Sequence, residues 1–226
     1  MYKQFSYDTT VYPFRDYVSS VFDTGDLEHL HEKRKDLLPE GKLNFENETK
    51  TKFHSTFYDR LNDGWEEIMD LYRSFVWNAV SEHVDEDQFL YQYFPSFRVH
   101  LPGDQAIHKW HYDSDDDHRH PDGEINFCIA ITEMFDSNTI WLESEPGAKD
   151  FYPMEASYGQ CTRFNGNKCV HGNKMNETDQ ARISFDFRVL PMSKYHPEKN
   201  TASVTANKKF IDGGYYRMCN VRTSVG

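Results

Sequence analysis

The chain has 226 residues, of which 38% are hydrophobic and 15% aromatic, and this size favours one folded domain with one large core. A formal net charge of -12 leaves no surplus of Lys and Arg to neutralise phosphates, which argues against nucleic acids and anionic membranes as partners. No run approaches the roughly 20 apolar residues that span a bilayer, and the opening MYKQFSYDTTVYPF has neither a basic start nor an apolar run. We therefore expect a soluble, cytoplasmic protein.

The first part of the chain, residues 1–87, has the texture of a helical region. Apolar residues recur three and four apart between Asp63 and Val84, which predicts one long amphipathic helix. A shorter polar helix is predicted from Leu27 to Asp36, before Pro39. The stretch from Asn44 to Lys52 is polar enough to predict a loop or a fraying helix.

Residues 88–190 contain short runs of aromatic and branched residues separated by turn residues, a spacing typical of a sandwich or barrel. The predicted strands are QFLYQYF, SFRVHL, QAIHKWHY, INFCIAIT, TIWLE, FYPM, QCTRFN and ARISFDFRVL. We expect a mainly β fold of about eight strands with flanking helices. In the extension 191–226, Gly213-Gly214 could turn a hairpin within FIDGGYYRMCNV, and this segment could cover a sheet edge or the mouth of a site. The four cysteines lack the paired spacing of a zinc site and are expected to be reduced thiols.

The HxD motif occurs three times, so its position must decide which copy could bind a metal. With 11 His and 21 Asp in 226 residues, chance supplies 11 × 21/226, or about one copy. His83/Asp85 lies at the end of the predicted helix, where residues two apart point in different directions, and His120/Asp122 flanks a proline in an acidic loop. His111/Asp113 follows the strand-like run QAIHKWH, where residues two apart share a face. This pair is the one expected to chelate an ion.

A third ligand is available 58 residues further on, at His171 in CVHGN. The other histidine beyond position 120, His196, lies in a polar segment and is expected at the surface. Two imidazoles and one carboxylate leave three open positions on an octahedral ion, as iron needs in order to bind a chelating co-substrate and then dioxygen.

Arg182 and Ser184 begin 11 residues after His171 and share one face of the predicted strand ARISFDFRVL. A guanidinium can pair with the far carboxylate of a dicarboxylic acid through two hydrogen bonds, and a serine hydroxyl can add another. A second RxS pair occurs at Arg222/Ser224. The order HxD, distal His and RxS is the uncommon feature.

In this order, HYD, CVHG and ARIS resemble the signature of the Fe(II)/2-oxoglutarate-dependent oxygenase superfamily, over about residues 88–190. The stretch EINFCIAITEMFDSNTIWLESEPG resembles the phytanoyl-CoA-hydroxylase-like branch and hydroxylases of the streptomycin-biosynthesis type. The resemblance implies a double-stranded β-helix core, of the jelly-roll or cupin kind, within a single oxygenase domain spanning 1–226.

The resemblance also implies roles for individual residues. His111, Asp113 and His171 would bind Fe(II), and Arg182 with Ser184 would hold the C5 carboxylate of 2-oxoglutarate. Further candidates for contacts with the co-substrate are Asn126, Thr139 and Arg98, although each is equally well explained as a polar residue satisfied within the barrel or at its rim. With dioxygen, such an enzyme converts 2-oxoglutarate to succinate and carbon dioxide. Because related halogenases lack the carboxylate ligand, Asp113 favours hydroxylation of a small-molecule substrate, with desaturation or ring formation as alternatives.

Other interpretations remain open at this stage. The same ligands could hold zinc in a hydrolase, or belong to a non-catalytic cupin-like protein that binds a metal or ligand. Asp113, Asp115, Asp117 and Glu124 have the spacing of an EF-hand loop, but His118 stands where that loop needs glycine. The acidic loop DSDDDHRHPDG is either a solvated loop or a means of attracting a cationic substrate such as an amine or amino sugar. The sequence identifies neither the oligomeric state nor the substrate, for which a secondary metabolite is one candidate.

Overall fold

A computed structural model describes residues 2–41, 43–44, 47–199 and 209–221. Ten strands dominate it, and all of their pairings are antiparallel. The strands are β1 (Lys3–Ser6), β2 (Gln88–Gln92), β3 (Ser96–His100), β4 (Ile125–Ala130), β5 (Ile140–Leu142), β6 (Tyr152–Met154), β7 (Gln160–Phe164), β8 (His171–Asn173), β9 (Arg182–Pro191) and β10 (Tyr216–Asn220). The prediction of a mainly β fold with flanking helices is confirmed.

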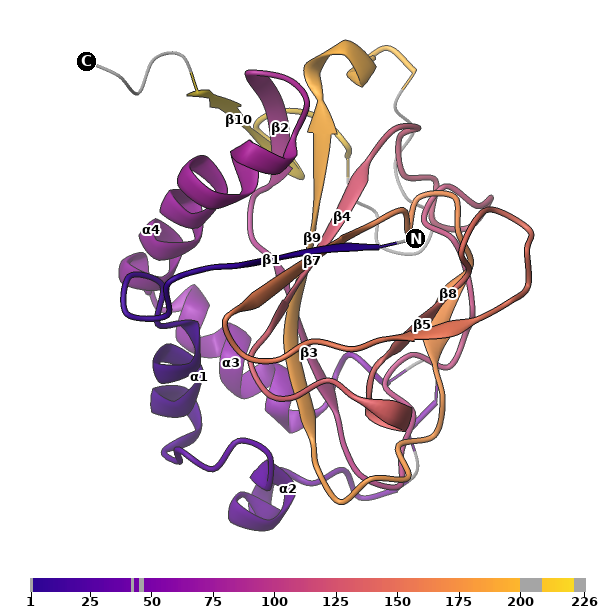
Figure 1. Cartoon of the computed structure of the whole chain (residues 1–226). Helices are drawn as coiled ribbons and strands as arrows, with labels where there is room; N and C mark the ends of the chain where they lie inside the picture. Colours follow the sequence, from indigo (N-terminus) through magenta and orange to yellow (C-terminus); the bar gives the residue numbers. More distant parts are fainter. Residues whose placement is uncertain (1, 42, 45–46, 200–208, 222–226) are drawn as a thin grey trace.

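The strands form two sheets. The larger sheet has the order β1-β7-β4-β9-β2-β10, with β3 also paired to β9, and the smaller sheet has the order β6-β5-β8. In Figure 1 the helices lie along one side of the larger sheet, whereas β5 and β8 lie on its other side. The helices are α1 (Phe14–Phe22), α2 (Leu30–Lys33), α3 (Lys52–Asn62) and α4 (Glu66–Phe75).

The main hydrophobic core lies between the helices and the larger sheet. Phe57 of α3 stacks on Phe97 of β3 with ring centroids 4.2 Å apart, and both side chains are fully buried. Tyr72 of α4 packs edge-on against Phe187 of β9 and donates its hydroxyl to the carbonyl of Gln92. These aromatic contacts hold one face of β9 and β3 against the helices. Alternate residues of both strands therefore point away from the helices.

Several sequence predictions hold. The helix predicted from Asp63 to Val84 is present as α4, continued by a π-helical turn (Val76–Val80) and a 3-10 turn (Ser81–His83). The shorter helix predicted from Leu27 to Asp36 is present as α2, followed by a 3-10 turn (Lys35–Leu37). All four cysteines are buried and free of disulfides. No helix in the described ranges is long and apolar enough to cross a bilayer.

Other predictions are wrong in detail. Residues 1–87 also contain β1, which joins the edge of the larger sheet through β7, and α1 and α3 were not expected. The run QAIHKWHY is an irregular segment with one isolated bridge at His111. The expectation that the extension 191–226 turns at Gly213-Gly214 and covers a sheet edge is, by contrast, confirmed, because the turn at Gly213 leads into β10, which pairs with β2 at the edge of the larger sheet. Arg222 and Ser224 lie outside the described residues.

Replacing Phe57 by Ala should remove the ring that joins α3 to β3. Because Phe57 is fully buried, we expect the free energy of unfolding to fall by about 3–5 kcal/mol. Trp77 is a matched control, since its side chain is 44% exposed, and Trp77→Ala should change the stability by less than about 1 kcal/mol. Chemical denaturation of both variants tests this, and equal losses would contradict the assigned core.

Candidate metal centre and adjoining pocket

Two histidines are brought together by a backbone bridge between segments distant in sequence. The His111 amide donates to the His171 carbonyl at 3.1 Å, and the His171 amide donates to the His111 carbonyl at 2.9 Å. Residues paired in this way across an antiparallel bridge carry their side chains on the same face. The two imidazole rings accordingly lie 4.7 Å apart between centroids.

Trp110 and Gly172, the neighbours of these histidines, pack against each other behind the bridge. A Cβ atom added to Gly172 would lie 2.7 Å from the Trp110 ring, so the indole rests directly on the glycine backbone. Phe151 packs edge-on against the same indole at 4.7 Å. Glycine at position 172 therefore allows the segment before His111 to come close to β8.

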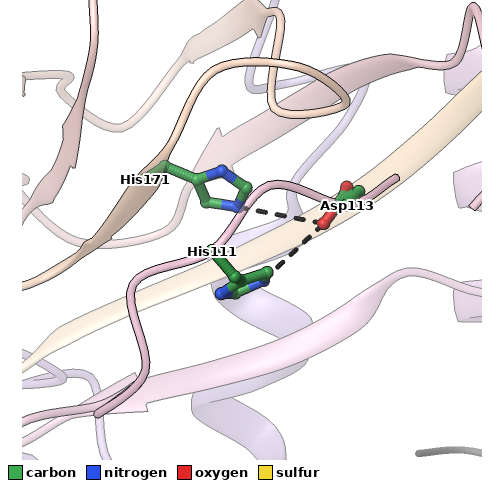
Figure 2. Close-up of side chains that lie close together, drawn as sticks. All are labelled: His111, Asp113 and His171. Atoms are coloured by element: carbon green, nitrogen blue, oxygen red, sulfur yellow. Dashed lines mark ion pairs between the residues drawn. The ribbon is translucent and has the colours of Figure 1, made fainter. Parts of the chain in front are cut away.

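Asp113 completes a group of three possible metal ligands. Its Oδ1 atom lies 3.7 Å from Nε2 of His111 and 3.9 Å from Nε2 of His171, and the carboxylate is buried. Figure 2 shows both imidazoles directed toward this oxygen. The Asp113 amide donates to the Gly166 carbonyl at 2.9 Å, which connects the segment that carries Asp113 to the residues just after β7. The three side chains are close enough together to hold one metal ion.

The hydrogen bonds of the histidines leave Nε2 available for a metal. Nδ1 of His111 lies 2.9 Å from the Lys109 carbonyl, and Nδ1 of His171 lies 3.1 Å from the Cys169 carbonyl. A carbonyl only accepts, so each Nδ1 carries the proton and each Nε2 presents a lone pair. Burial lowers the pKa of His111 to about 3 and also lowers the pKa of His171, so both rings are neutral near pH 7. This donor set fits a divalent transition metal.

The Asp113 carboxylate is held from the side opposite the histidines. Asn126 of β4 donates Nδ2 to it at 2.6 Å, and Arg188 of β9 donates Nε at 3.0 Å. These two donors are direct partners in the register of β4 and β9. Burial alone would raise the pKa of Asp113, but the charge of Arg188 above all outweighs it and holds that pKa well below the ordinary value. Asp113 is therefore a carboxylate near pH 7.

Alternate residues of β9 line a pocket beside this centre. Ile183, Phe185 and Phe187 point into the helix-facing core, so the residues between them point the other way. The pocket is lined by Arg98, Ile107, His111, Ile140, Phe164, His171, Gly172, Asn173, Arg182, Asp186 and Arg188. The candidate metal ligands His111 and His171 thus share one pocket with Arg182.

The three arginines of this pocket differ in how their charge is balanced. Arg98 and Arg188 both pair with Asp186, at 2.6 Å and 3.0 Å, and Arg188 also pairs with Asp113. Arg182 forms no ion pair with any residue that the structure describes; it donates Nε to the Asn138 carbonyl at 3.1 Å and one terminal nitrogen to Ser184 Oγ at 2.8 Å. Burial lowers the pKa of Arg182 to about 10, which still leaves it charged near pH 7. Its position and charge suit an anionic group.

The structure separates the three remaining sequence candidates. Asn126 is bound to Asp113 and is absent from the pocket lining, whereas Arg98 lines the pocket as the partner of Asp186. Thr139 is fully buried and donates its hydroxyl to the Met154 carbonyl, so its side chain links the start of β5 to β6. The sequence analysis did not identify Asp186 and Arg188 as pocket residues. The alternation along the strand that places Arg182 and Ser184 on one face also places Asp186 and Arg188 there.

Most carboxylates of the acidic loop have partners within the protein. Asp115, Asp117 and Asp122 pair with His118, Lys109 and Lys168. Glu124 is buried and bound by His120 and by the hydroxyl of Tyr216. Although Asp113, His120 and Glu124 also lie close together, these pairings account for the loop without a calcium ion.

Comparison with known proteins finds a relative that matches over nearly the full length of the chain. The streptomycin biosynthesis protein StrG of Streptomyces griseus is 32% identical over 215 residues, which cover 95% of this chain and 97% of StrG. No family model matches the chain.

Solved structures are more distant. AviO1 from Streptomyces viridochromogenes has a TM-score of 0.46 and 15% identity, over 86% of this chain and 91% of AviO1. SnoK, a non-haem alpha-ketoglutarate-dependent carbocyclase from nogalamycin biosynthesis, has a TM-score of 0.47 and 11% identity, over 96% of this chain and 91% of SnoK.

Replacing Gly172 by Ala should displace the Trp110 ring and strain the bridge between His111 and His171. We expect the affinity of the metal-free protein for Mn(II) to fall about tenfold or more, as when other groups that orient metal ligands are lost. Gly25→Ala is the control, because a Cβ there meets nothing within 4 Å. Titration with Mn(II) measures both, and an unchanged affinity in Gly172→Ala would contradict the role of this contact.

Proposed function

The chain belongs to the family of the streptomycin biosynthesis protein StrG, and on this premise we propose that it is a non-haem Fe(II)- and 2-oxoglutarate-dependent dioxygenase that hydroxylates a small molecule. In this proposal His111, Asp113 and His171 hold Fe(II), and Arg182 with Ser184 holds the C5 carboxylate of 2-oxoglutarate. The two sheets would be the halves of a double-stranded β-helix, within one oxygenase domain spanning residues 1–226.

The observation that carries the proposal is the pocket shared by two candidate metal ligands and one arginine without an ion-pair partner among the described residues. A dicarboxylic acid that chelates a metal with one end needs a cation for the other end. The paired arginines, Arg98 and Arg188, are already neutralised by Asp186 and Asp113. A zinc hydrolase has no evident need for such a buried guanidinium, which is why we prefer the oxygenase.

The protein's own residues would perform binding, orientation and exclusion of water. Bound Fe(II), with 2-oxoglutarate and dioxygen, supplies the oxidation of a substrate C–H bond while 2-oxoglutarate becomes succinate and carbon dioxide. The Nδ1 contacts to Lys109 and Cys169 orient the two imidazoles, and Phe164 and Ile140 provide apolar walls around the pocket. Related halogenases lack the carboxylate ligand, so the presence of Asp113 among the candidate ligands favours hydroxylation.

We propose a small molecule of secondary metabolism as the substrate. The relative takes part in streptomycin biosynthesis, which supports a small molecule of secondary metabolism as substrate. Asp117 and Asp122 pair with Lys109 and Lys168, and Asp115 is hydrogen-bonded to His118, which weakens the idea that the acidic loop attracts a cationic substrate. We therefore regard this loop as structural.

His111→Ala, Asp113→Ala and His171→Ala should each reduce bound Fe(II) from about one ion per chain to about a tenth or less, because a facial site cannot lose one of three ligands and keep its affinity. Anaerobic loading followed by metal analysis measures this. His196→Ala is the control, since its side chain is exposed and should leave iron binding unchanged. A triad variant that retained a full equivalent of iron would remove that residue from the site.

Arg182→Met should weaken 2-oxoglutarate about 100-fold, as expected when a buried charge-assisted pair worth about 3 kcal/mol is lost, and should change the affinity for Fe(II) far less. Arg182→Lys keeps the charge without the planar fork and should give an intermediate loss. Arg217→Met on β10 serves as control, because Arg217 lies over Tyr93, outside the pocket. Calorimetric titration with 2-oxoglutarate at saturating metal tests the assignment, which fails if Arg182→Met binds as tightly as the unaltered protein.

A further inference from the structure

The two oxygens of the Asp113 carboxylate have different surroundings. Oδ1 faces the Nε2 atoms of both histidines at 3.7 and 3.9 Å. Oδ2 accepts hydrogen bonds from Asn126 Nδ2 at 2.6 Å and Arg188 Nε at 3.0 Å, and Oδ1 accepts a longer one from a terminal nitrogen of Arg188 at 3.3 Å. A carboxylate can bind a metal through one oxygen or through both. Here Oδ1 faces the candidate metal position and accepts one long hydrogen bond, whereas Oδ2 accepts two shorter ones.

Arg188 is itself held by a second ion pair. Its third guanidinium nitrogen donates to Asp186 Oδ2 at 3.0 Å, and Arg98 donates to both oxygens of Asp186, at 2.6 and 3.3 Å. Charges therefore alternate along Arg98, Asp186, Arg188 and Asp113, with two cations and two anions. Asp186 and Arg188 lie on the same face of β9, and Arg98 lies on the neighbouring strand β3.

We propose that Arg188 is a positioning residue that restrains Oδ2 of Asp113, so that Asp113 binds the metal through Oδ1 alone. Asp186 and Arg98 act through Arg188, by holding its guanidinium in the plane that meets the carboxylate. The inference rests on the proposed metal site. Binding through one oxygen keeps a further coordination position free for the chelating co-substrate, so Arg188 would influence the geometry of the site without touching the reacting atoms.

The position of Arg188 in the sheet supports this role. Arg188 and Asn126 are opposite each other in the register of β9 and β4, so both donors approach Oδ2 from a rigid part of the larger sheet. The guanidinium offers three nitrogens in one plane, and all three are used here, two on Asp113 and one on Asp186. A lysine has a single nitrogen and could not reproduce this arrangement.

The experiment compares Arg188→Met, Arg188→Lys and Asp186→Asn with the unaltered protein. Metal-free protein is titrated with Mn(II) without 2-oxoglutarate, and the visible spectrum of the Co(II) form is recorded as a measure of coordination number. We expect Arg188→Met to weaken Mn(II) about 10–100-fold, and Arg188→Lys and Asp186→Asn to weaken it less. The Co(II) bands of Arg188→Met should change, because Asn126 alone then restrains Oδ2 and Asp113 can rotate toward binding through both oxygens.

Arg15→Met is the matched control for loss of a partly buried ion pair. Arg15 pairs with Glu28 through two hydrogen bonds of 2.6 Å, away from the pocket. We expect Arg15→Met to lower the melting temperature while leaving Mn(II) affinity and the Co(II) spectrum unchanged. Loss of stability alone would thus be distinguished from loss of positioning.

Unchanged Mn(II) affinity and Co(II) spectrum in folded Arg188→Met would overturn the inference while leaving the proposed oxygenase function intact. If Arg188→Met does not fold, Asp186→Asn decides, because it retains Arg188 and Asp113 and removes the charge that holds both Arg188 and Arg98. An unchanged Mn(II) affinity in Asp186→Asn would likewise overturn the inference. Failure of the unaltered protein to bind Mn(II) or Fe(II) would remove the metal site, and the inference with it.

Discussion

The alternation of side chains along β9 links the packing of the protein to the chemistry of its pocket. Ile183, Phe185, Phe187 and Val189 are buried in the core beneath the helices, while Arg182, Ser184, Asp186 and Arg188 lie on the opposite face. Because β9 is hydrogen-bonded to β2, β3 and β4, its register cannot shift by one residue without moving the charged row into the core and the aromatic row into the pocket. The hydrophobic core therefore fixes where the arginines stand.

Charge in the pocket is distributed so that one cation is left for a ligand. Arg98 and Arg188 are balanced by Asp186 and Asp113, which makes this part of the pocket wall neutral and rigid. Arg182, buried beside Ser184, has no carboxylate partner in the described part of the chain. A buried guanidinium without a counter-ion is unfavourable by itself, and a bound carboxylate would relieve that penalty. The proposed site for 2-oxoglutarate thus follows from the same network that orients the metal ligand.

Local sequence patterns predicted the parts of this arrangement that have a regular period. The spacing of ARISFDFRVL grouped Arg182 with Ser184, and helical periodicity located α4. The strand expected before His111 is absent, and the side chains of His111 and His171 converge through a backbone bridge between residues 60 positions apart, which no local pattern encodes. Strand β8 has three residues, too few for a periodic signal. Helix α3 does carry Phe53, Phe57 and Leu61 at helical spacing, and this signal was overlooked. Ion pairs between strands, such as Arg98 with Asp186, depend on a register that only the fold supplies.

In the proposed function, one pocket binds Fe(II) and 2-oxoglutarate together, with the metal at the histidines and the distal carboxylate at Arg182. Anaerobic titration of the metal-free protein with Fe(II) and 2-oxoglutarate tests it most directly, through the weak visible charge-transfer band that a chelated keto acid gives with ferrous iron. We expect a band that requires both components and saturates at about one equivalent of each. Iron binding without such a band at any concentration of 2-oxoglutarate would contradict it.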